Sequence, residues 1–185
     1  MPSLVMLLRH AEKPLGGEPP HGVTIDGTSD PESLTPRGWQ RAGALVGLFA
    51  PGRIGPTAGG LPTPTHLVAS QIVGNGSQRP RETLLPVSER LGLPVDSRFT
   101  KDEVIGLVGA IRTMEGTILV AWEHHLIPSI ATLLVGDASR VPQIWPDDRY
   151  DIVWVFDTSR PGHTGFREIP QMLLAGDSPK PIATP

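Results

Sequence analysis

The 185-residue sequence predicts an α/β protein, a three-layer α/β/α sandwich in which helices cover both faces of a mostly parallel central sheet. Short continuous apolar runs are the form expected of strands buried on both faces, and they occur at residues 3–8, 66–70, 117–122 and 151–156. Segments with helical spacing alternate with these runs, which indicates right-handed crossovers between parallel strands. The 21 glycines and 21 prolines favour many turns and long loops over a helical bundle.

A long loop and then a helix are predicted after the first apolar run. Residues 14–33 are rich in Gly, Pro, Asp and Ser and lack periodicity, so we expect a loop over the end of the first strand. Thr35 as N-cap and Pro36 at the first helical position begin a helix whose apolar residues recur on one face. The Pro51-Gly52 pair is expected to end this helix.

Three more helices are predicted between the later strands. Residues 80–91 keep helical spacing and are expected to kink at Pro86. Thr100 and Glu103 form a capping-box pattern ahead of a further helix. Residues 128–134, which begin with a proline, are expected to form the last helix.

The end of the chain is expected to lie at an edge of the sheet. Residues 166–173 are predicted to form an edge strand, because Pro170 cannot donate a hydrogen bond within a central strand. The Pro-rich tail from about Ser178 is expected to be flexible. The length suits one sizeable core and no linker is visible, so we predict a single domain over residues 1–185.

Composition restricts the classes of partner. A formal net charge of -3 gives no overall basic field, so we expect no nucleic-acid or membrane partner, and an anionic ligand would need a local cluster of cations. There are no cysteines, which excludes disulfides and thiolate chemistry. The apolar stretch Leu4 to Leu8 is too short to span a membrane, and Arg9 interrupts it before a signal-peptide core forms, so we expect a cytoplasmic protein.

Histidine-containing groups follow two of the predicted strands directly. Arg9-His10 follows the first strand, and Glu123-His124-His125 follows the strand at 117–122. In parallel α/β sheets, ligands bind outside the carboxyl ends of the strands. We therefore expect both groups to face one crevice.

The stretch Arg9-His10-Ala11-Glu12 resembles the Arg-His-Gly signature of the histidine phosphatase superfamily, with Ala11 in the third place. Three further stretches resemble later motifs of the family in the same order. They are Leu34 to Ala42, similar to Leu-Thr-x-x-Gly-x-x-Gln-Ala; Ser70 with Arg79 to Thr83, similar to Ser…Arg-x-x-x-Thr; and Trp122-Glu123-His124, similar to the second histidine motif. The resemblance covers roughly residues 3–157 and implies a phosphoglycerate mutase-like fold.

The resemblance implies a histidine-dependent phosphatase with His10 as nucleophile, and the chemistry agrees. A neutral imidazole is a competent nucleophile when its second nitrogen donates to an acceptor that fixes the tautomer. The planar fork of arginine binds two phosphate oxygens at once, so Arg9 and Arg79 are the predicted clamp. His124 is expected to donate to the phosphoryl oxygens. Arg81 competes with Arg79, but the Arg-x-x-x-Thr spacing favours Arg79.

The acid that protonates the leaving group is left unassigned. In one branch of the family an Asp follows the second histidine, and here His125 takes that place, either as a protonated acid or simply facing solvent. Glu12 either supports the site or only orients its neighbours. Glu123 would alternate to the opposite face if the strand continued. Asp102 and Glu103 are explained as acids of a first helical turn.

Several classes of function compete with a phosphatase. A metal hydrolase is disfavoured because no H-E-x-x-H or H-x-H occurs and the adjacent side chains of His124 and His125 tend to diverge, so we predict no metal and no cofactor. A mutase and a phosphate-binding module without turnover stay open as alternatives. The expected partner is a small phosphorylated substrate or a phosphoprotein, while its identity and the oligomeric state of the chain do not follow from the sequence.

Overall fold

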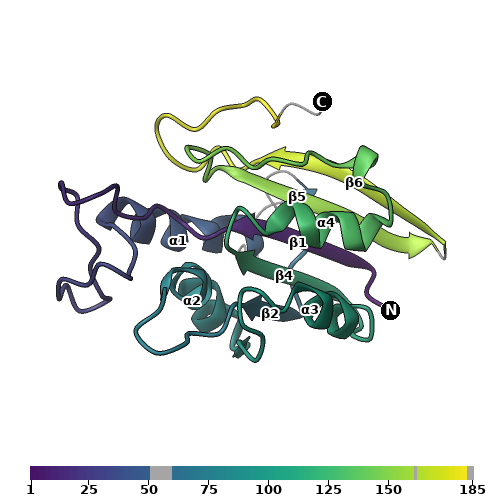
Figure 1. Cartoon of the computed structure of the whole chain (residues 1–185), viewed down its shortest axis with the longest axis horizontal. Helices are drawn as coiled ribbons and strands as arrows, with labels where there is room; N and C mark the ends of the chain where they lie inside the picture. The colour runs from purple at the N-terminus through teal and green to yellow at the C-terminus, as the bar shows by residue number, and fades with distance from the viewer. Residues whose placement is uncertain (51–59, 161, 183–185) are drawn as a thin grey trace.

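The computed structural model describes residues 1–50, 60–160 and 162–182 (Figure 1). Its centre is a six-stranded sheet in the order β3-β2-β4-β1-β5-β6. The strands are β1 (Leu4–Arg9), β2 (His66–Ala69), β3 (Val95–Asp96), β4 (Thr117–Trp122), β5 (Ile152–Arg160) and β6 (His163–Pro170). The strands β1 to β4 pair in parallel, β5 is antiparallel to β1, and β6 is antiparallel to β5. The mostly parallel sheet is therefore confirmed.

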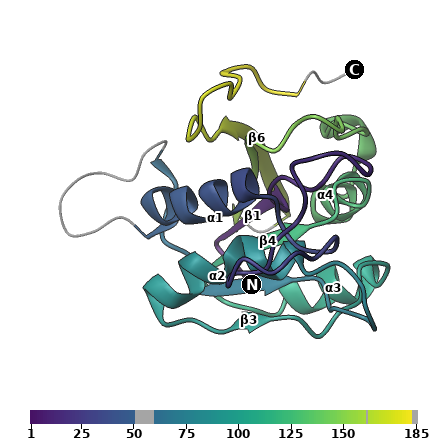
Figure 2. The same cartoon turned by 90° about the vertical axis from the view of Figure 1, so that its left-hand side faces the viewer.

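Helices cover both faces of the sheet, as predicted (Figure 2). The helices are α1 (Pro36–Phe49), α2 (Arg79–Leu91), α3 (Val104–Ile111) and α4 (Ile127–Val135), with a short 3-10 turn at Ala138–Arg140. One buried cluster joins α1 and α2 to one face of the sheet, and a second joins α3 and α4 to the other. The molecule is thus a three-layer α/β/α sandwich.

The central strand β1 shows why its sequence is continuously apolar. Val5 and Leu7 pack into the cluster beneath α3 and α4, whereas Met6 and Leu8 pack into the cluster beneath α1 and α2. None of the four side chains is exposed. Because successive side chains point to opposite faces and both faces are covered, no position in the strand tolerates a polar residue until the sheet ends.

The start of α1 brings that helix against the chain that follows β1. The Thr35 hydroxyl accepts a hydrogen bond from the Gly38 amide at 3.2 Å, which confirms Thr35 as the N-cap. A Cβ on Gly38 would lie 2.5 Å from the main-chain oxygen of Glu12. Glycine therefore permits a close approach of α1 to the segment after His10. The predicted breaker at Pro51-Gly52 lies outside the described residues.

Several element boundaries differ from the predictions. The helix α3 begins at Val104 with Glu103 as its cap, and the Glu103 carboxylate accepts from the amide and hydroxyl of Thr100 at 2.8 and 2.9 Å. The Thr100–Glu103 contacts of the predicted capping box therefore stabilise the turn that precedes α3, and Glu103 itself is the N-cap of the helix. The strand β5 runs on to Arg160 and β6 already begins at His163, because the two form a long antiparallel pair whose outer part is polar and invisible to an apolar pattern.

The end of the chain is packed rather than free over the residues that the structure describes. The Ser178 amide donates to Asp151 at 2.6 Å, and the Ile182 amide donates to Glu168 at 3.0 Å. Ile182 itself is buried in the core. Residues 178–182 thus contact the core, and the flexibility of the tail stays a prediction. Within the described residues, no helix is both long and apolar enough to cross a membrane.

Candidate active site

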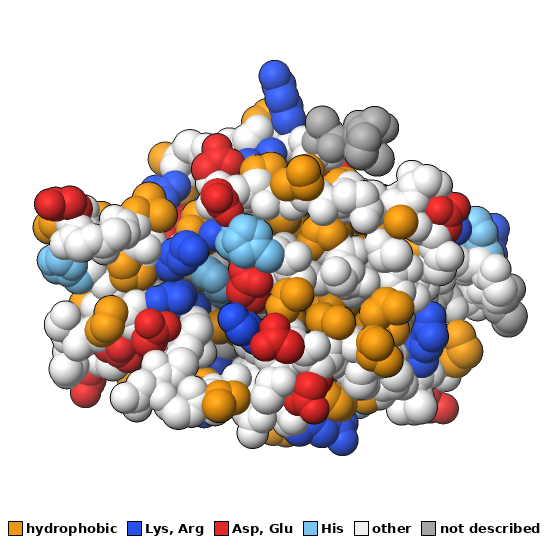
Figure 3. All heavy atoms as spheres, in the orientation of Figure 1, with side chains coloured by type: hydrophobic (Ala, Val, Ile, Leu, Met, Phe, Trp, Pro, Cys, Tyr) orange, Lys and Arg blue, Asp and Glu red, His pale blue; other side chains and the backbone are white. Residues whose placement is uncertain are grey.

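A cavity of about 540 Å³ opens at the carboxyl end of β1 beside His10. The His10 amide donates to the Trp122 carbonyl at 3.0 Å, so the chain leaving β1 stays next to the chain leaving β4. Charged side chains of both signs gather over this end of the sheet (Figure 3). The charged residues that line the cavity with His10 are Lys13, Glu32, Arg79, Lys101, Asp102 and Glu123.

His10 has the environment of a neutral imidazole. Its side chain is buried, and Nδ1 lies 2.8 Å from the carbonyl oxygen of Ala11. Burial, helped by the nearby positive charges of Arg9 and Arg79 and opposed by the contact with the Ala11 carbonyl, lowers the pKa of His10 to about 3. With Nδ1 donating to a carbonyl that can only accept, Nε2 carries a free electron pair. This tautomer is the one that the predicted nucleophile requires.

The segment that carries His10 is anchored to α2. The Ala11 amide donates to the Thr83 hydroxyl at 2.8 Å, and that hydroxyl donates to the Arg79 carbonyl at 2.7 Å. The Arg-x-x-x-Thr spacing therefore places one arginine at the cavity and one hydroxyl beneath the histidine, a helical turn apart.

Arg79 lines the cavity and Arg81 does not. The Arg79 guanidinium contacts Glu32 at 3.3 Å and the Ser77 hydroxyl at 3.2 Å, and it also donates to main-chain carbonyls of the 31–33 segment. Arg81 points outward from α2 and is exposed. Of the two competing arginines, the structure thus brings only Arg79 to the cavity with His10.

Arg9 is engaged elsewhere, which differs from its predicted place in a phosphate clamp. Its buried guanidinium donates to the carbonyls of Pro146, Asp147 and Arg149 and to the Tyr150 hydroxyl. The guanidinium carbon also lies 3.8 Å from the centre of the Tyr150 ring. In this structure Arg9 therefore anchors the 146–150 segment and does not line the cavity.

His124 likewise lies behind the cavity wall. It is buried, and its Nε2 lies 2.6 Å from the Asp147 carboxylate. Burial lowers the pKa of His124, and the hydrogen bond to Asp147 partly opposes this shift. Nε2 is thus committed to Asp147, and the predicted donation to phosphoryl oxygens has no counterpart here. His125, the other candidate, is 69% exposed and also does not line the cavity.

Glu123 reaches the cavity instead, contrary to the predicted alternation. The strand β4 ends at Trp122, so the two-residue period does not continue through Glu123 and His124. Asp102 lines the cavity too, because α3 begins only at Val104 and leaves Asp102 in the preceding turn. Neither carboxylate was predicted from the sequence to reach the site. The available signal was their position directly after a buried strand or before a helix, at the edge where the sheet ends.

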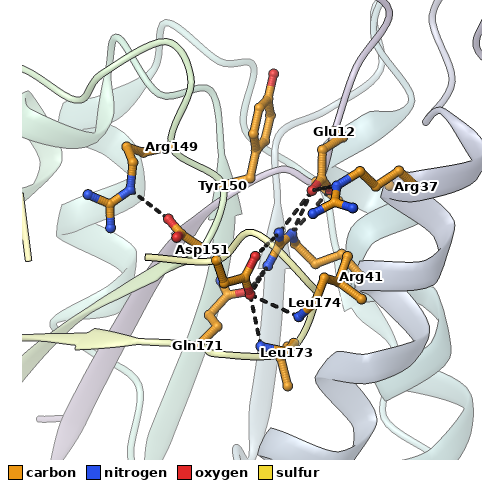
Figure 4. A network of polar contacts seen from close by, with 12 residues as sticks. Glu12, Arg37, Arg41, Arg149, Tyr150, Asp151, Gln171, Leu173 and Leu174 are labelled. Carbon is orange, nitrogen blue, oxygen red and sulfur yellow. Dashed lines mark hydrogen bonds and ion pairs between the residues drawn. The ribbon is translucent and has the colours of Figure 1, made fainter. Parts of the chain in front are cut away.

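Glu12 belongs to a buried ion network behind the site (Figure 4). It pairs with Arg41 at 2.9 Å and with the more exposed Arg37 at 3.3 Å. Arg41 also pairs with Asp177 at 2.7 Å, and its side chain is almost fully buried. Glu12 thus links the chain after His10 to α1 and to the C-terminal segment, so its contacts are those of an orienting residue.

Solved structures share this fold over nearly the whole chain. Neither a family model nor a curated protein sequence matches the chain. SixA from Agrobacterium tumefaciens, a candidate phosphohistidine phosphatase, is 17% identical, with a TM-score of 0.54 over 91% of this chain and 97% of its own. A mycobacterial glucosyl-3-phosphoglycerate phosphatase, solved with inorganic phosphate, is 14% identical, with a TM-score of 0.54 over 90% of this chain and 95% of its own.

A third structure, a candidate alpha-ribazole-5'-P phosphatase from Escherichia coli, is 15% identical, with a TM-score of 0.52 over 89% of this chain and 94% of its own. These three proteins belong to the histidine phosphatase superfamily. At such low identity the likeness establishes architecture, and substrates do not transfer with it. The chain therefore has the phosphoglycerate mutase-like fold of the histidine phosphatases.

Proposed function

We propose that this protein is a phosphatase that hydrolyses a phosphomonoester or a phosphoramidate through a covalent phosphohistidine on His10. One observation carries the proposal: a buried imidazole, fixed by the Ala11 carbonyl with Nε2 unprotonated, lines a cavity that also holds Lys13, Arg79 and Lys101. A nucleophile that is neutral at working pH, together with fixed positive charge, is what phosphoryl transfer requires of a protein.

The reaction would proceed in two displacements. In the first, the Nε2 electron pair of His10 attacks phosphorus, the bond from phosphorus to the leaving oxygen or nitrogen breaks, and the leaving group takes a proton from an acid. In the second, the ionised acid takes a proton from water as the water oxygen attacks the phosphohistidine, the N–P bond breaks, and inorganic phosphate leaves with His10 and the acid restored. The fork of Arg79 would stabilise the charge on the equatorial oxygens in both steps, aided by Lys13 and Lys101.

The leaving-group proton is assigned here to Asp102 or Glu123. Three carboxylates line the cavity, but Glu32 already pairs with Arg79. His125, the candidate from the sequence, faces solvent outside the cavity. Replacing Asp102 by Asn and Glu123 by Gln separates the two. The variant that lacks the acid should lose activity most on substrates with poor leaving groups and least on an activated ester such as a nitrophenyl phosphate.

The comparisons support the class of reaction and leave the substrate open. Two of the similar structures are phosphatase candidates and one is a phosphatase solved with phosphate. The residues that line the cavity are mostly charged or polar, which suits a polar leaving group. We therefore propose a small phosphorylated metabolite or a phosphoprotein as substrate. A mutase and a phosphate-binding module are the alternatives.

Inhibition by phosphate mimics tests the proposal. A site built for a trigonal-bipyramidal transition state should bind vanadate more tightly than inorganic phosphate. Arg79→Lys should weaken vanadate binding because an ammonium group cannot form the two-pronged contact, whereas Arg81→Lys, on the exposed face of the same helix, should leave it unchanged. Equal affinity for the two anions would indicate a binding module, and transfer of phosphate to a second substrate position without its release would indicate a mutase.

A further inference from the structure

Three potential metal ligands lie together where the chain leaves β4. Glu123, His124 and His125 each offer one ligand atom, and the three atoms lie within 4.8 Å of one another. The two imidazole rings lie against each other, with their centres 3.8 Å apart and their planes tilted by 37°. The expectation that these adjacent side chains diverge is therefore wrong. The chain turns at the end of the strand, so the alternation that would separate the rings is lost.

The buried ring of His124 has one nitrogen without a partner. His124 is 1% exposed, and its Nδ1 has no hydrogen-bond partner. Its Nε2 lies 2.6 Å from the Asp147 carboxylate, to which it donates. A hydrogen bond from one ring nitrogen to a carboxylate is the usual support of a metal-binding histidine, because it fixes the tautomer and makes the other nitrogen more basic. The free electron pair of His124 is therefore on Nδ1.

That electron pair faces a carboxylate. The Glu123 Oε1 atom lies 2.9 Å from Nδ1 of His124, without the alignment of a hydrogen bond. Two acceptor atoms at this distance repel each other unless a proton or a metal ion lies between them. Ligand atoms on a tetrahedral zinc ion are separated by about 3.4 Å, given bonds of about 2.1 Å. A shift of a few tenths of an ångström by the Glu123 side chain, which is 25% exposed, would make room for such an ion.

We propose that Glu123, His124 and His125 bind one divalent transition-metal ion of the Zn²⁺ class. Two imidazoles and one carboxylate suit Zn²⁺, Co²⁺, Ni²⁺ or Cu²⁺, whereas Mg²⁺ and Ca²⁺ prefer oxygen ligands. His125 is 69% exposed and free to swing onto the ion. Three protein ligands leave a fourth coordination position open.

The ion would lie at the wall of the His10 cavity, because Glu123 lines that cavity. It would hold the carboxylate of Glu123 away from a leaving group, so metal binding should inhibit turnover. This consequence rests on the proposed phosphatase function; the binding itself does not. A chelator should accordingly raise or preserve activity, in contrast to its effect on a metal hydrolase.

The site is tested by titrating the chelator-treated, metal-free protein with Co²⁺. Four-coordinate Co²⁺ absorbs visible light more strongly than the hydrated ion, so binding can be followed by absorbance. We expect saturation at one ion per chain, and displacement of Co²⁺ by Zn²⁺. His125→Ala, at an exposed position, should weaken binding at least tenfold, and Glu123→Gln should also weaken it. His66→Ala is the matched control, because His66 is an exposed histidine at the start of β2, and it should bind as the wild type does.

Two outcomes would overturn the metal site. One is the absence of a saturable Co²⁺ spectrum; the other is equal affinity in the wild type and the His125→Ala protein. Both readouts are taken without substrate, so they stand whether or not the protein proves to be a phosphatase. Conversely, a phosphatase that Zn²⁺ does not inhibit, but that binds Co²⁺ as described, would contradict only the inhibition.

Discussion

The carbonyl oxygen of Ala11 lies 2.8 Å from Nδ1 of His10, so the residue after the proposed nucleophile determines which ring nitrogen is free. The same residue donates its amide to the Thr83 hydroxyl at 2.8 Å. Through these two main-chain contacts, Ala11 ties the orientation of the His10 ring to the position of α2. The orientation of His10 depends on main-chain contacts, which a side-chain substitution at position 11 would leave in place.

Thr83 is accordingly predicted to be a positioning residue. Thr83→Val removes the oxygen that accepts from the Ala11 amide and leaves that amide buried without a partner, which should lower the free energy of unfolding by about 1–3 kcal/mol. The ring of His10 should also lose its alignment, so kcat should fall more than KM rises. Thr83→Ser keeps the hydroxyl and should restore kcat. A loss of stability in Thr83→Val with unchanged kcat would show that the contact is only structural.

The low pKa of His10 predicts a loss of stability in acid. Burial lowers the pKa of His10 to about 3 in the folded protein, against about 6.5 in the unfolded chain. As the pH falls below 6.5, the unfolded state binds a proton that the folded state refuses, so unfolding becomes easier down to about pH 3. Between pH 7 and pH 5, the wild type should lose about 2 kcal/mol more than His10→Gln in urea unfolding. Parallel losses in the two proteins would contradict this account.

The approach of α1 to the His10 segment can be tested with two glycines of the same helix. A Cβ at Gly38 would lie 2.5 Å from the Glu12 carbonyl oxygen, so Gly38→Ala must displace either the helix or that segment, and should destabilise the protein by about 1–3 kcal/mol. A Cβ at Gly43 would meet nothing within 4 Å. Gly43→Ala should therefore stabilise the protein by about 1 kcal/mol. Thermal unfolding of both variants measures the difference, and equal effects would argue against the close contact.

The ion network behind the site predicts unequal roles for two arginines that share Glu12. Arg41 is buried between Glu12 and Asp177, so Arg41→Leu leaves Glu12 with only the more exposed Arg37 and Asp177 with only main-chain amides. The loss of the buried positive charge should lower the free energy of unfolding by about 3–5 kcal/mol. The side chain of Arg37 is 46% exposed, and Arg37→Leu should lower the free energy of unfolding by less than about 1 kcal/mol. Chemical denaturation of the two proteins compares them directly, and similar losses would show that burial does not set the strength of the network.

The elements of the core followed from the sequence because their signals are local. The run at 117–122 and the Thr35-Pro36 start of α1 depend on side-chain type and spacing within a few residues, and both are observed as predicted. The two-residue strand β3 is too short to carry a pattern of its own. The polar outer half of the β5–β6 pair is held by main-chain pairing, which leaves no side-chain pattern in the sequence.

The site was predicted in part for the same physical reason. Position after a buried strand placed His10 at the edge of the sheet, and the resemblance to the Arg-x-x-x-Thr motif singled out Arg79; both residues line one cavity. The directions of the Arg9 and His124 side chains depend on their acceptors in the 146–150 segment, more than twenty residues away from either one. That choice of partner is a tertiary contact, so no local pattern contained it.

The most direct test of the central claim is the covalent intermediate on His10. Attack by imidazole on phosphorus gives a phosphoramidate, which survives alkali and breaks in acid, whereas an acyl phosphate on Glu123 or Asp102 is labile in alkali. After brief reaction with a labelled substrate and a quench in base, the label should be found on the peptide that contains His10, and His10→Ala should lose label and turnover together. Label on His124 or His125, or full turnover by His10→Ala, would contradict the account.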